Sequence, residues 1–414
     1  MTTAVEPTRT TERRDFRVST PAAAEGRWTL NFGPQHPATH TTLHLELELE
    51  GETVVGCRPH IGYLHSGFEK LGEHLNYNQY VVVTDRMNYI SPMANNIAWH
   101  TACEKLFNIT PPPRCQYIRT VIAELARIQD HLLCNGAAAL DLGAFSVFLY
   151  TFQQREYIYD IFEAVCGHRF TTSYTRLGGL MNDAPEGWFD RISKFVDGLE
   201  PVLDEVEKLL VRNRIFVDRT KGVGAISRQD AINWSLTGPV ARASGVERDV
   251  RKNEPYLVYK ELDFKVPVAS GGDVYCRFLV RLAEMRESVK MIRQLIKQVP
   301  GGPVNVDTDL KVVLPDKKDV YGSIEGLIHH FEIVMTNRGF MPPVAECYAA
   351  NEAANGELGF YLVSDGGPCA YRAKCRPPSF NNFQVFPVLV KGHLISDVAA
   401  ILGSLNIIAA ELDR

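Results

Sequence analysis

The sequence predicts an α+β fold in which a central bundle of long helices is flanked by small β-sheets near the two ends of the chain. Three observations predict it. From Leu43 to Leu49, leucines alternate with polar residues, which is the period of a half-buried strand. From Phe278 to Ile296, apolar residues recur every three or four positions, as on a helix packed in a bundle. Two further segments with strand character follow residue 341.

The N-terminal elements come first. Residues 1–26 are polar and lack the apolar core of roughly 7–15 residues that a secretory signal needs, so they predict a flexible tail. Residues 27–62 predict an antiparallel β region. Residues 28–32 alternate like a strand, the loop "GPQHPATH" leads to the leucine strand, and Gly51 turns that strand into the next.

The middle of the chain, residues 63–340, predicts a helical bundle. "ARIQDHLL", "REYIYDIFEAVCG" and "EMRESVKMIRQLIKQ" have helical spacing, and Gly167 is expected to end the second of them. Residues 219–270 are too irregular for one helix and predict an ordered excursion from the bundle. A break rich in glycine and proline precedes a helix expected near 319–337. Residues 341–414 then predict a C-terminal β/α region.

Composition excludes several classes of protein. The chain has 414 residues, 45% hydrophobic and 22% charged, which are ordinary globular values. Its net charge of −5 argues against nucleic-acid binding, and it has no apolar run of the roughly 18–20 residues that span a membrane. The nine cysteines are scattered and form no CxxC motif, which predicts reduced thiols and no metal cluster held by this chain.

The loop before the leucine strand contains two candidate functional residues, His36 and His40. Pro34 and Pro37 fix their backbone φ angles and leave the loop few conformations. Spacing alone leaves two interpretations open. The imidazoles either hydrogen-bond to backbone carbonyls, or they act as proton donors or ligand-binding groups held in a cleft.

Two later segments contain further candidates. In "TDRMNYISP", Arg86 and Tyr89 are three residues apart, and in "ALDLGAFSVF", Asp141 lies among apolar neighbours. The simplest interpretation gives the Tyr89 hydroxyl a carbonyl partner and makes Asp141 the N-cap of a helix whose first turn is 142–145. Taken together, a histidine, a tyrosine and an aspartate also form an acid set suited to a substrate that takes up protons.

Eight motifs occur in a fixed order along the chain: "GPQHPATH", "HIGYLHSGFEK", "TDRMNYISP", "LDLGAFSVF", "ASGVERDVRKNEPY", "EMRESVK", "ELGFYLVSDGG" and "RPPSF". In these motifs the chain resembles the D subunit of NADH–quinone oxidoreductase, which is the large core subunit of the quinone-reducing module of respiratory complex I. The resemblance runs from about residue 28 to the terminal "ELDR". That family is similar to the large subunit of nickel–iron hydrogenases, so the resemblance implies a hydrogenase-large-subunit-like fold.

The resemblance also implies roles for the candidate residues. His40 and Tyr89 are expected to hydrogen-bond the quinone headgroup and to donate protons to it, and Asp141 is expected to be the carboxylate associated with His40. An imidazolium and a phenol suit a reaction that places charge on two carbonyl oxygens. Three further residues are expected to line the same cavity: His36, His65 and Arg86.

Further expectations concern the surroundings of the chain. The resemblance implies quinone as substrate, with electrons from an iron–sulfur cluster on a B-type partner protein and NADH bound elsewhere in the complex. It implies C-type and membrane H-type neighbours, coupling to proton translocation, and a peripheral position on the cytoplasmic side of the inner membrane. Two alternatives are a non-catalytic assembly or scaffold paralogue and the equivalent component of a ferredoxin- or deazaflavin-linked quinone oxidoreductase.

The chain departs from the family pattern at several positions. The two CxxC motifs of the hydrogenase relatives are absent, so a nickel–iron site is not expected here. The direct quinone contacts are kept, while part of the surrounding shell is changed. The departures are Thr41 for glycine, His44 for arginine, Ser66 for arginine, Thr171 for histidine, and Ala354 and Asn355 for proline and a basic residue.

Overall fold

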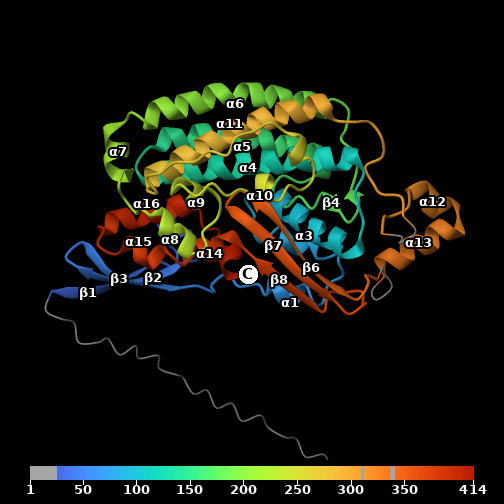
Figure 1. Cartoon of the computed structure of the whole chain (residues 1–414), viewed down its shortest axis with the longest axis horizontal. Helices are drawn as coiled ribbons and strands as arrows, with labels where there is room; N and C mark the ends of the chain where they lie inside the picture. The colour runs from blue at the N-terminus through green and yellow to red at the C-terminus, as the bar shows by residue number, and fades with distance from the viewer. Residues whose placement is uncertain (1–25, 309–311, 336–340) are drawn as a thin grey trace, which may run out of the picture.

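The computed structural model describes residues 26–308, 312–335 and 341–414. The predicted tail, residues 1–26, lies outside this part except for its last residue. Figure 1 shows a layer of long helices along one side of the molecule and two small sheets on the other side. None of the helices in the described ranges has the length and apolar character needed to cross a membrane.

The N-terminal sheet consists of β1 (Arg27–Phe32), β2 (His44–Glu50) and β3 (Thr53–His60), which are antiparallel and hydrogen-bonded in that order. Leu47 of β2 is paired with residues of both neighbours and is fully buried, as are the leucines two positions before and after it. The sheet places these leucines against α15 (Phe386–Val390) and α16 (Ile395–Leu405). The predicted alternation is confirmed.

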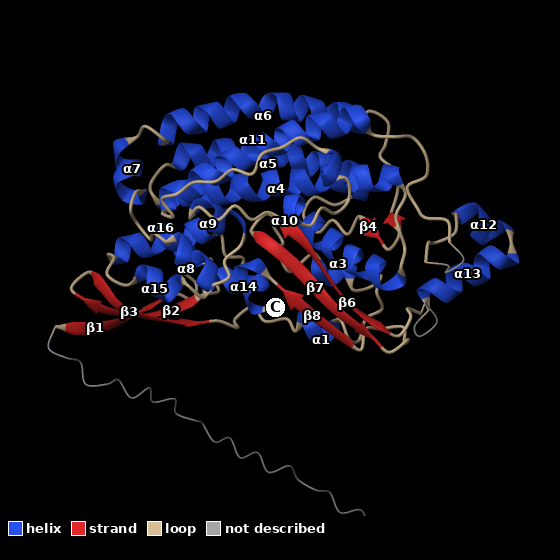
Figure 2. Ribbon diagram, in the orientation of Figure 1, coloured by secondary structure: helices blue, strands red, loops and turns tan. Residues whose placement is uncertain are grey.

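Four long helices form the bundle, and Figure 2 shows them side by side: α4 (Pro113–Asp141), α5 (Phe145–Cys166), α6 (Trp188–Leu210) and α11 (Val274–Gln298). The apolar seam predicted on α11 is buried in their common core. Gly167, with φ +76°, ends α5 as predicted. In α4, every residue from Tyr117 to Leu132 is buried because other elements pack around it.

Two expectations about helix ends are wrong. Asp141 is the last residue of α4 and not an N-cap, because the alanine- and leucine-rich segment before it continues the helix. Gly143, with φ +89°, separates it from α5. The single helix expected near 319–337 is two helices, α12 (Lys317–Gly322) and α13 (Ile324–Val334), since Ser323 ends the first and caps the second.

Short elements complete the structure. α7 (Arg214–Thr220) leads into the excursion, which contains α8 (Arg228–Asn233), α9 (Gly238–Ala243), α10 (Val250–Asn253) and η2 (Tyr259–Glu261). Elsewhere in the middle of the chain lie α1 (Phe68–Leu71), α2 (Val81–Thr84), α3 (Pro92–Phe107), β4 (Thr175–Arg176) and β5 (Gly179–Leu180).

The C-terminal region contains a second antiparallel sheet: β6 (Ala345–Ala353), β7 (Gly356–Ser364) and β8 (Arg372–Arg376). It packs on α3 through a shared apolar cluster. After α14 (Pro378–Phe383) the chain runs through α15 and α16 to α17 (Ala409–Asp413), which is buried for most of its length. The C-terminus lies between the two sheets in the view of Figure 1, and its last two residues are partly exposed.

Candidate functional site

The loop that carries the two histidines is tightly folded. Its centre is the short helix η1 (Pro37–Thr39), which packs against α16. The Nδ1 atom of His36 accepts a hydrogen bond from the Ala38 amide at 3.2 Å, and the His36 carbonyl accepts one from the Thr41 amide at 3.2 Å. A side chain at Gly33 would lie 2.2 Å from the carbonyl oxygen of Leu43, so only glycine fits there. The loop thus presents its histidines on a fixed backbone.

His40 follows η1 in the left-handed region, with φ +52°. Its Nδ1 atom is 2.7 Å from the carbonyl oxygen of Ile407, in the turn after α16. A carbonyl can only accept, so Nδ1 carries a proton and donates it, which leaves Nε2 for another partner. Burial lowers the pKa of His40, and the Ile407 carbonyl partly offsets this. The protonated, imidazolium form of His40 therefore releases its proton readily.

Tyr89 lies in the turn that follows α2 and is partly buried, with its ring 6.1 Å from that of Phe170. Burial raises the pKa of Tyr89, which keeps the phenol protonated. Its hydroxyl has no hydrogen-bond partner among the described residues, so the carbonyl expected from the simplest interpretation is not found there. The exposed Arg86 donates to the Val82 carbonyl at 2.9 Å. Tyr89 is thus a neutral donor without a protein acceptor in the described part.

A buried carboxylate connects the two segments. Asp130 of α4 accepts a hydrogen bond from Asn88 Nδ2 at 3.3 Å and another from Asn406 Nδ2. Asn88 immediately precedes Tyr89, and Asn406 immediately precedes Ile407, which binds His40. The Asp130 side chain therefore anchors two segments: the one next to Tyr89, and the one whose Ile407 carbonyl binds His40. Sequence reasoning missed Asp130, because its helix is buried on all sides and shows no polar face.

Asp141 is brought together with His36. Both residues line a hollow of about 390 Å³ between the histidine loop and the start of α16. The walls of the hollow raise the pKa of Asp141 to about 6, although its side chain keeps access to solvent, and His36 acts in the opposite direction. Among the described residues, His36 is thus the group whose charge acts on Asp141, whereas His40 is hydrogen-bonded to the Ile407 carbonyl.

His65 lies in the loop after β3 and is exposed. Its Nδ1 atom is 2.8 Å from the backbone carbonyl of Asp413, close to the end of the chain. The Asp413 carboxylate in turn accepts hydrogen bonds from the amides of Gly62 at 2.9 Å and Leu64 at 2.7 Å. In this structure His65 fastens its loop to the C-terminal helix.

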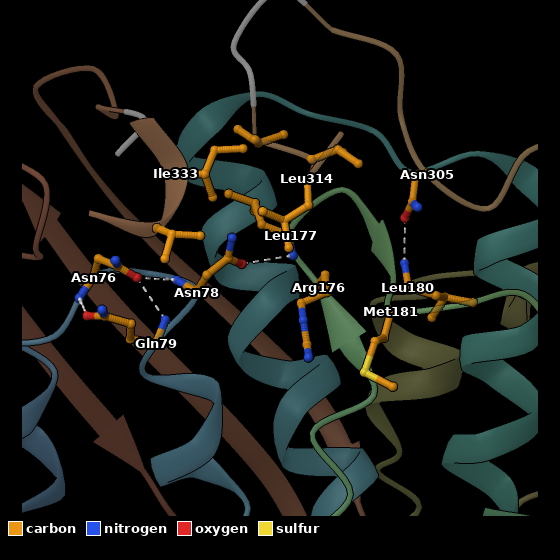
Figure 3. Close-up of a pocket in the computed structure, with 13 residues that line it drawn as sticks. Asn76, Asn78, Gln79, Arg176, Leu177, Leu180, Met181, Asn305, Leu314 and Ile333 are labelled. Carbon is orange, nitrogen blue, oxygen red and sulfur yellow. Dashed lines mark hydrogen bonds between the residues drawn. The ribbon is translucent and has the colours of Figure 1, made fainter. Parts of the chain in front are cut away.

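A separate cavity of about 460 Å³ lies between the loop before α2, the β4–β5 turn and α13, and Figure 3 shows its lining. Asn78 and Asn305 use their side-chain oxygens to accept from the amides of Leu177 and Leu180, at 3.4 and 2.9 Å. None of the six predicted site residues lines it. It is therefore distinct from the candidate site.

The described ranges contain no group of three or more histidine, cysteine, aspartate or glutamate side chains placed to hold a metal ion. All nine cysteines are free, and burial raises the pKa of Cys103 and Cys375 well above the ordinary value. Thiols of this kind stay protonated and unreactive.

Comparison with known proteins decides the family. Residues 141–414 match the family model described as "Respiratory-chain NADH dehydrogenase, 49 Kd subunit". The chain belongs to this family. The D subunit of NADH-quinone oxidoreductase from Methylacidiphilum infernorum is 49% identical over 403 residues, which cover 97% of this chain and 95% of that protein. The D 1 subunit from Opitutus terrae is 50% identical over 388 residues, which cover 94% of this chain and 91% of that protein.

A third relative is a fused protein. The C/D subunit of NADH-quinone oxidoreductase from Bdellovibrio bacteriovorus is 51% identical over 385 residues, which cover 93% of this chain and 68% of that protein. The resemblance to the D subunit is therefore confirmed over most of the chain. Members of this family are components of NADH-quinone oxidoreductase, the electron-transport complex also called complex I, so the chain is part of a multi-subunit oxidoreductase.

Proposed function

We propose that this chain forms, with an iron–sulfur B-type partner, the site where quinone is reduced and protonated. One observation carries the proposal. Asp130 holds the segments next to His40 and Tyr89 together, and among the described residues neither the Tyr89 hydroxyl nor the His40 Nε2 atom has a partner. The hydroxyl can donate to one carbonyl oxygen of a quinone, and Nε2 can donate to the other once the imidazole is protonated.

The chemistry assigned to each residue follows from its surroundings. Reduction of a quinone to a quinol takes two electrons and two protons, and the partner's iron–sulfur cluster supplies the electrons. Tyr89, kept neutral by burial, donates its phenolic proton to one quinone oxygen. His40 binds the other oxygen through Nε2, and its lowered pKa favours release of the imidazolium proton to the reduced oxygen.

Asp141 is proposed to support this reaction from the edge of the site. Its carboxylate attracts the histidine loop through His36, and through that loop it stabilises the cationic form of His40. His36, His65 and Arg86 are proposed to border the quinone-binding region. Within it, His36 has the best-supported place, because it shares a hollow with Asp141.

The complex around the chain is part of the same proposal. NADH is bound by other proteins of the complex, a C-type protein and a membrane H-type protein are neighbours, and quinone reduction is coupled to proton translocation. The fused C/D relative supports a C-type neighbour. The chain is proposed to lie peripherally on the cytoplasmic side of the inner membrane, with a fold like that of hydrogenase large subunits.

Substitutions in the assembled complex test the proposal. Tyr89→Phe and His40→Ala each remove one donor, so quinone reductase activity is expected to fall roughly 10²-fold or more while the electron donor still reduces the clusters. Tyr321→Phe, which changes an exposed tyrosine on α12, is the matched control and leaves turnover unchanged. Normal turnover in both site variants would instead support the scaffold alternative. Activity with ferredoxin but not with NADH would support the ferredoxin-linked alternative.

A further inference from the structure

A second buried acid lies close to Asp130. Glu411 of α17 is fully buried, as is Asp130, and Glu411 lies near enough for the charge of Asp130 to act on it. Among the described residues, neither carboxylate forms an ion pair with an arginine or lysine. Asp130 is bonded to asparagine amides, and Glu411 to the Ser379 hydroxyl. Two buried carboxylates without a cation cannot both remain ionised at low cost.

An unsatisfied amide lies between the two acids. Asn355, in the turn between β6 and β7, accepts a hydrogen bond from Asn406, the same amide that donates to Asp130. The Nδ2 atom of Asn355 and the Oε1 atom of Glu411 are both buried without a hydrogen-bond partner among the described residues. The groups between the two acids are thus amides, which carry no charge.

The groups that face Glu411 come from several surrounding elements. They are Asp130 from α4, the Cys375 thiol from β8, the Ser379 hydroxyl from α14 and the Asn355 amide. Burial is the largest influence and raises the pKa of Glu411 to about 7, and Asp130 raises it further, against the hydrogen bond from Ser379.

In the described part of the chain, the cations near this cluster form no ion pair with either acid, and Arg414 and Lys374 act on the Cys375 thiol. Arg281 of α11 and Arg155 of α5 act on neighbours of Asp130 or on Asp130 itself through space, and neither is hydrogen-bonded to it among the described residues. The His131 imidazole is on the same helix and donates to Glu284 instead. The balance around the two acids therefore favours one bound proton.

We propose that Asp130 and Glu411 share one proton, carried by Glu411, and that this neutral acid is a positioning residue for the quinone site. The proton sharing stands on the complete burial of both acids and on the uncharged amides of Asn406 and Asn355 beside them, and the positioning role rests on the proposed function. The Ser379 hydroxyl donates to Glu411 and accepts a hydrogen bond from the Ile408 amide at 3.3 Å. Ile408 follows Ile407, whose carbonyl binds His40.

Ionisation of Glu411 would break this arrangement. It places a second negative charge beside Asp130, so Asn406, which donates to Asp130, and the adjoining Ile407 carbonyl must shift. His40 would then lose its fixed orientation, and quinone binding would weaken as pH rises.

Infrared spectroscopy of the assembled complex tests the shared proton. The C=O stretch of a protonated carboxylic acid is expected in the wild type below neutral pH, with a titration midpoint near 7. Glu411→Gln removes this band, and Glu205→Gln, a matched change of an exposed glutamate on α6, leaves it in place. Asp130→Asn moves the midpoint to lower pH, which keeps the test valid if Glu411→Gln fails to assemble. Absence of a band that depends on Glu411 overturns the proposal.

Quinone kinetics test the positioning role. Between about pH 6 and about pH 8, the wild-type KM for quinone is expected to rise several-fold, whereas in Glu411→Gln it stays constant because glutamine has no proton to lose. A band that depends on Glu411 combined with a wild-type KM that does not change with pH overturns the positioning role alone. Normal turnover in Tyr89→Phe and His40→Ala overturns the proposed function, and the infrared result still stands.

Discussion

Two buried charged regions meet at α4, and their acids differ in protonation. His131 and Asp130 are adjacent on this helix and so point about 100° apart. His131 faces a network in which Glu284 is paired with Arg242 at 2.7 Å, and this pairing holds the pKa of Glu284 far below its ordinary value. Asp130 faces Glu411, whose pKa is raised to about 7. Equal burial thus accompanies opposite pKa shifts at Glu284 and Glu411, and their partners differ: Glu284 is paired with Arg242, whereas Glu411 is bonded to the Ser379 hydroxyl.

The network shows what arginine contributes. Arg242 of α9 donates to Glu284 of α11 and to Glu352 of β6, both at 2.7 Å, and Arg251 of α10 pairs with Asp249 at 2.6 Å. A guanidinium stays charged when buried and offers five donors in a fixed plane. The network therefore fastens the irregular excursion to the bundle and the C-terminal sheet. The acid pair, with amide and hydroxyl partners only, is left able to titrate.

The largest effect is expected from removing the central cation of the network. Arg242→Met leaves the carboxylates of Asp249, Glu284 and Glu352 buried without their shared partner, which should cost roughly 3–5 kcal/mol in the free energy of unfolding. Urea denaturation measures it. Arg214→Met is the control, since Arg214 is almost fully exposed and its loss is expected to have little effect. A loss for Arg242→Met as small as that of the control would show that the network does not stabilise the fold.

The second prediction concerns the pH dependence of stability at the acid pair. The pKa of Glu411 is raised from 4.5 to about 7, so the native state binds this proton more tightly than the unfolded state does. Its favourable contribution is complete below pH 4.5 and is lost as pH rises to about 7. Relative to Glu411→Gln, the wild type should lose roughly 3 kcal/mol of unfolding free energy over that window and no more above it. Equal slopes for the two proteins against pH would contradict the raised pKa.

The contrast between the two regions also explains what the sequence can predict. The leucine strand and the α11 seam were predictable because burial on one face imposes a local period. Asp130 lies in a helix buried on every side, so its segment has helical spacing but no polar face that marks the carboxylate. Its partner Glu411 comes from the other end of the chain, and only the packing of α17 into the interior joins them. Asp141 appeared to be a helix start for a related reason, since nothing local shows where α4 ends.

The same reasoning applies to the candidate site. The roles predicted for His40 and Tyr89 followed from the resemblance. The groups that hold these two residues in place did not. The Ile407 carbonyl that orients His40 is a backbone group, which no side-chain motif can reveal. The interaction of Asp141 with His36 depends on how the loop is folded at Gly33.

The smallest effect is expected at Asp141, which has a raised pKa like Glu411 but keeps solvent access and a histidine nearby. Because the pKa is about 6, the carboxylate is ionised at neutral pH and becomes protonated as pH falls below that value. Quinone reductase activity of the assembled complex should therefore decline on the acid side of pH 6. Asp141→Asn should lower activity roughly tenfold at neutral pH and abolish this acid limb.

His36→Gln separates the two ways in which Asp141 can act. This substitution removes the charge that opposes the rise in the Asp141 pKa, so the acid limb moves to higher pH in either case. If the carboxylate works through His36, kcat/KM well above this limb falls as far as in Asp141→Asn. If the carboxylate acts on His40 alone, kcat/KM there stays near the wild-type value, so this measurement determines which histidine of the loop the carboxylate serves.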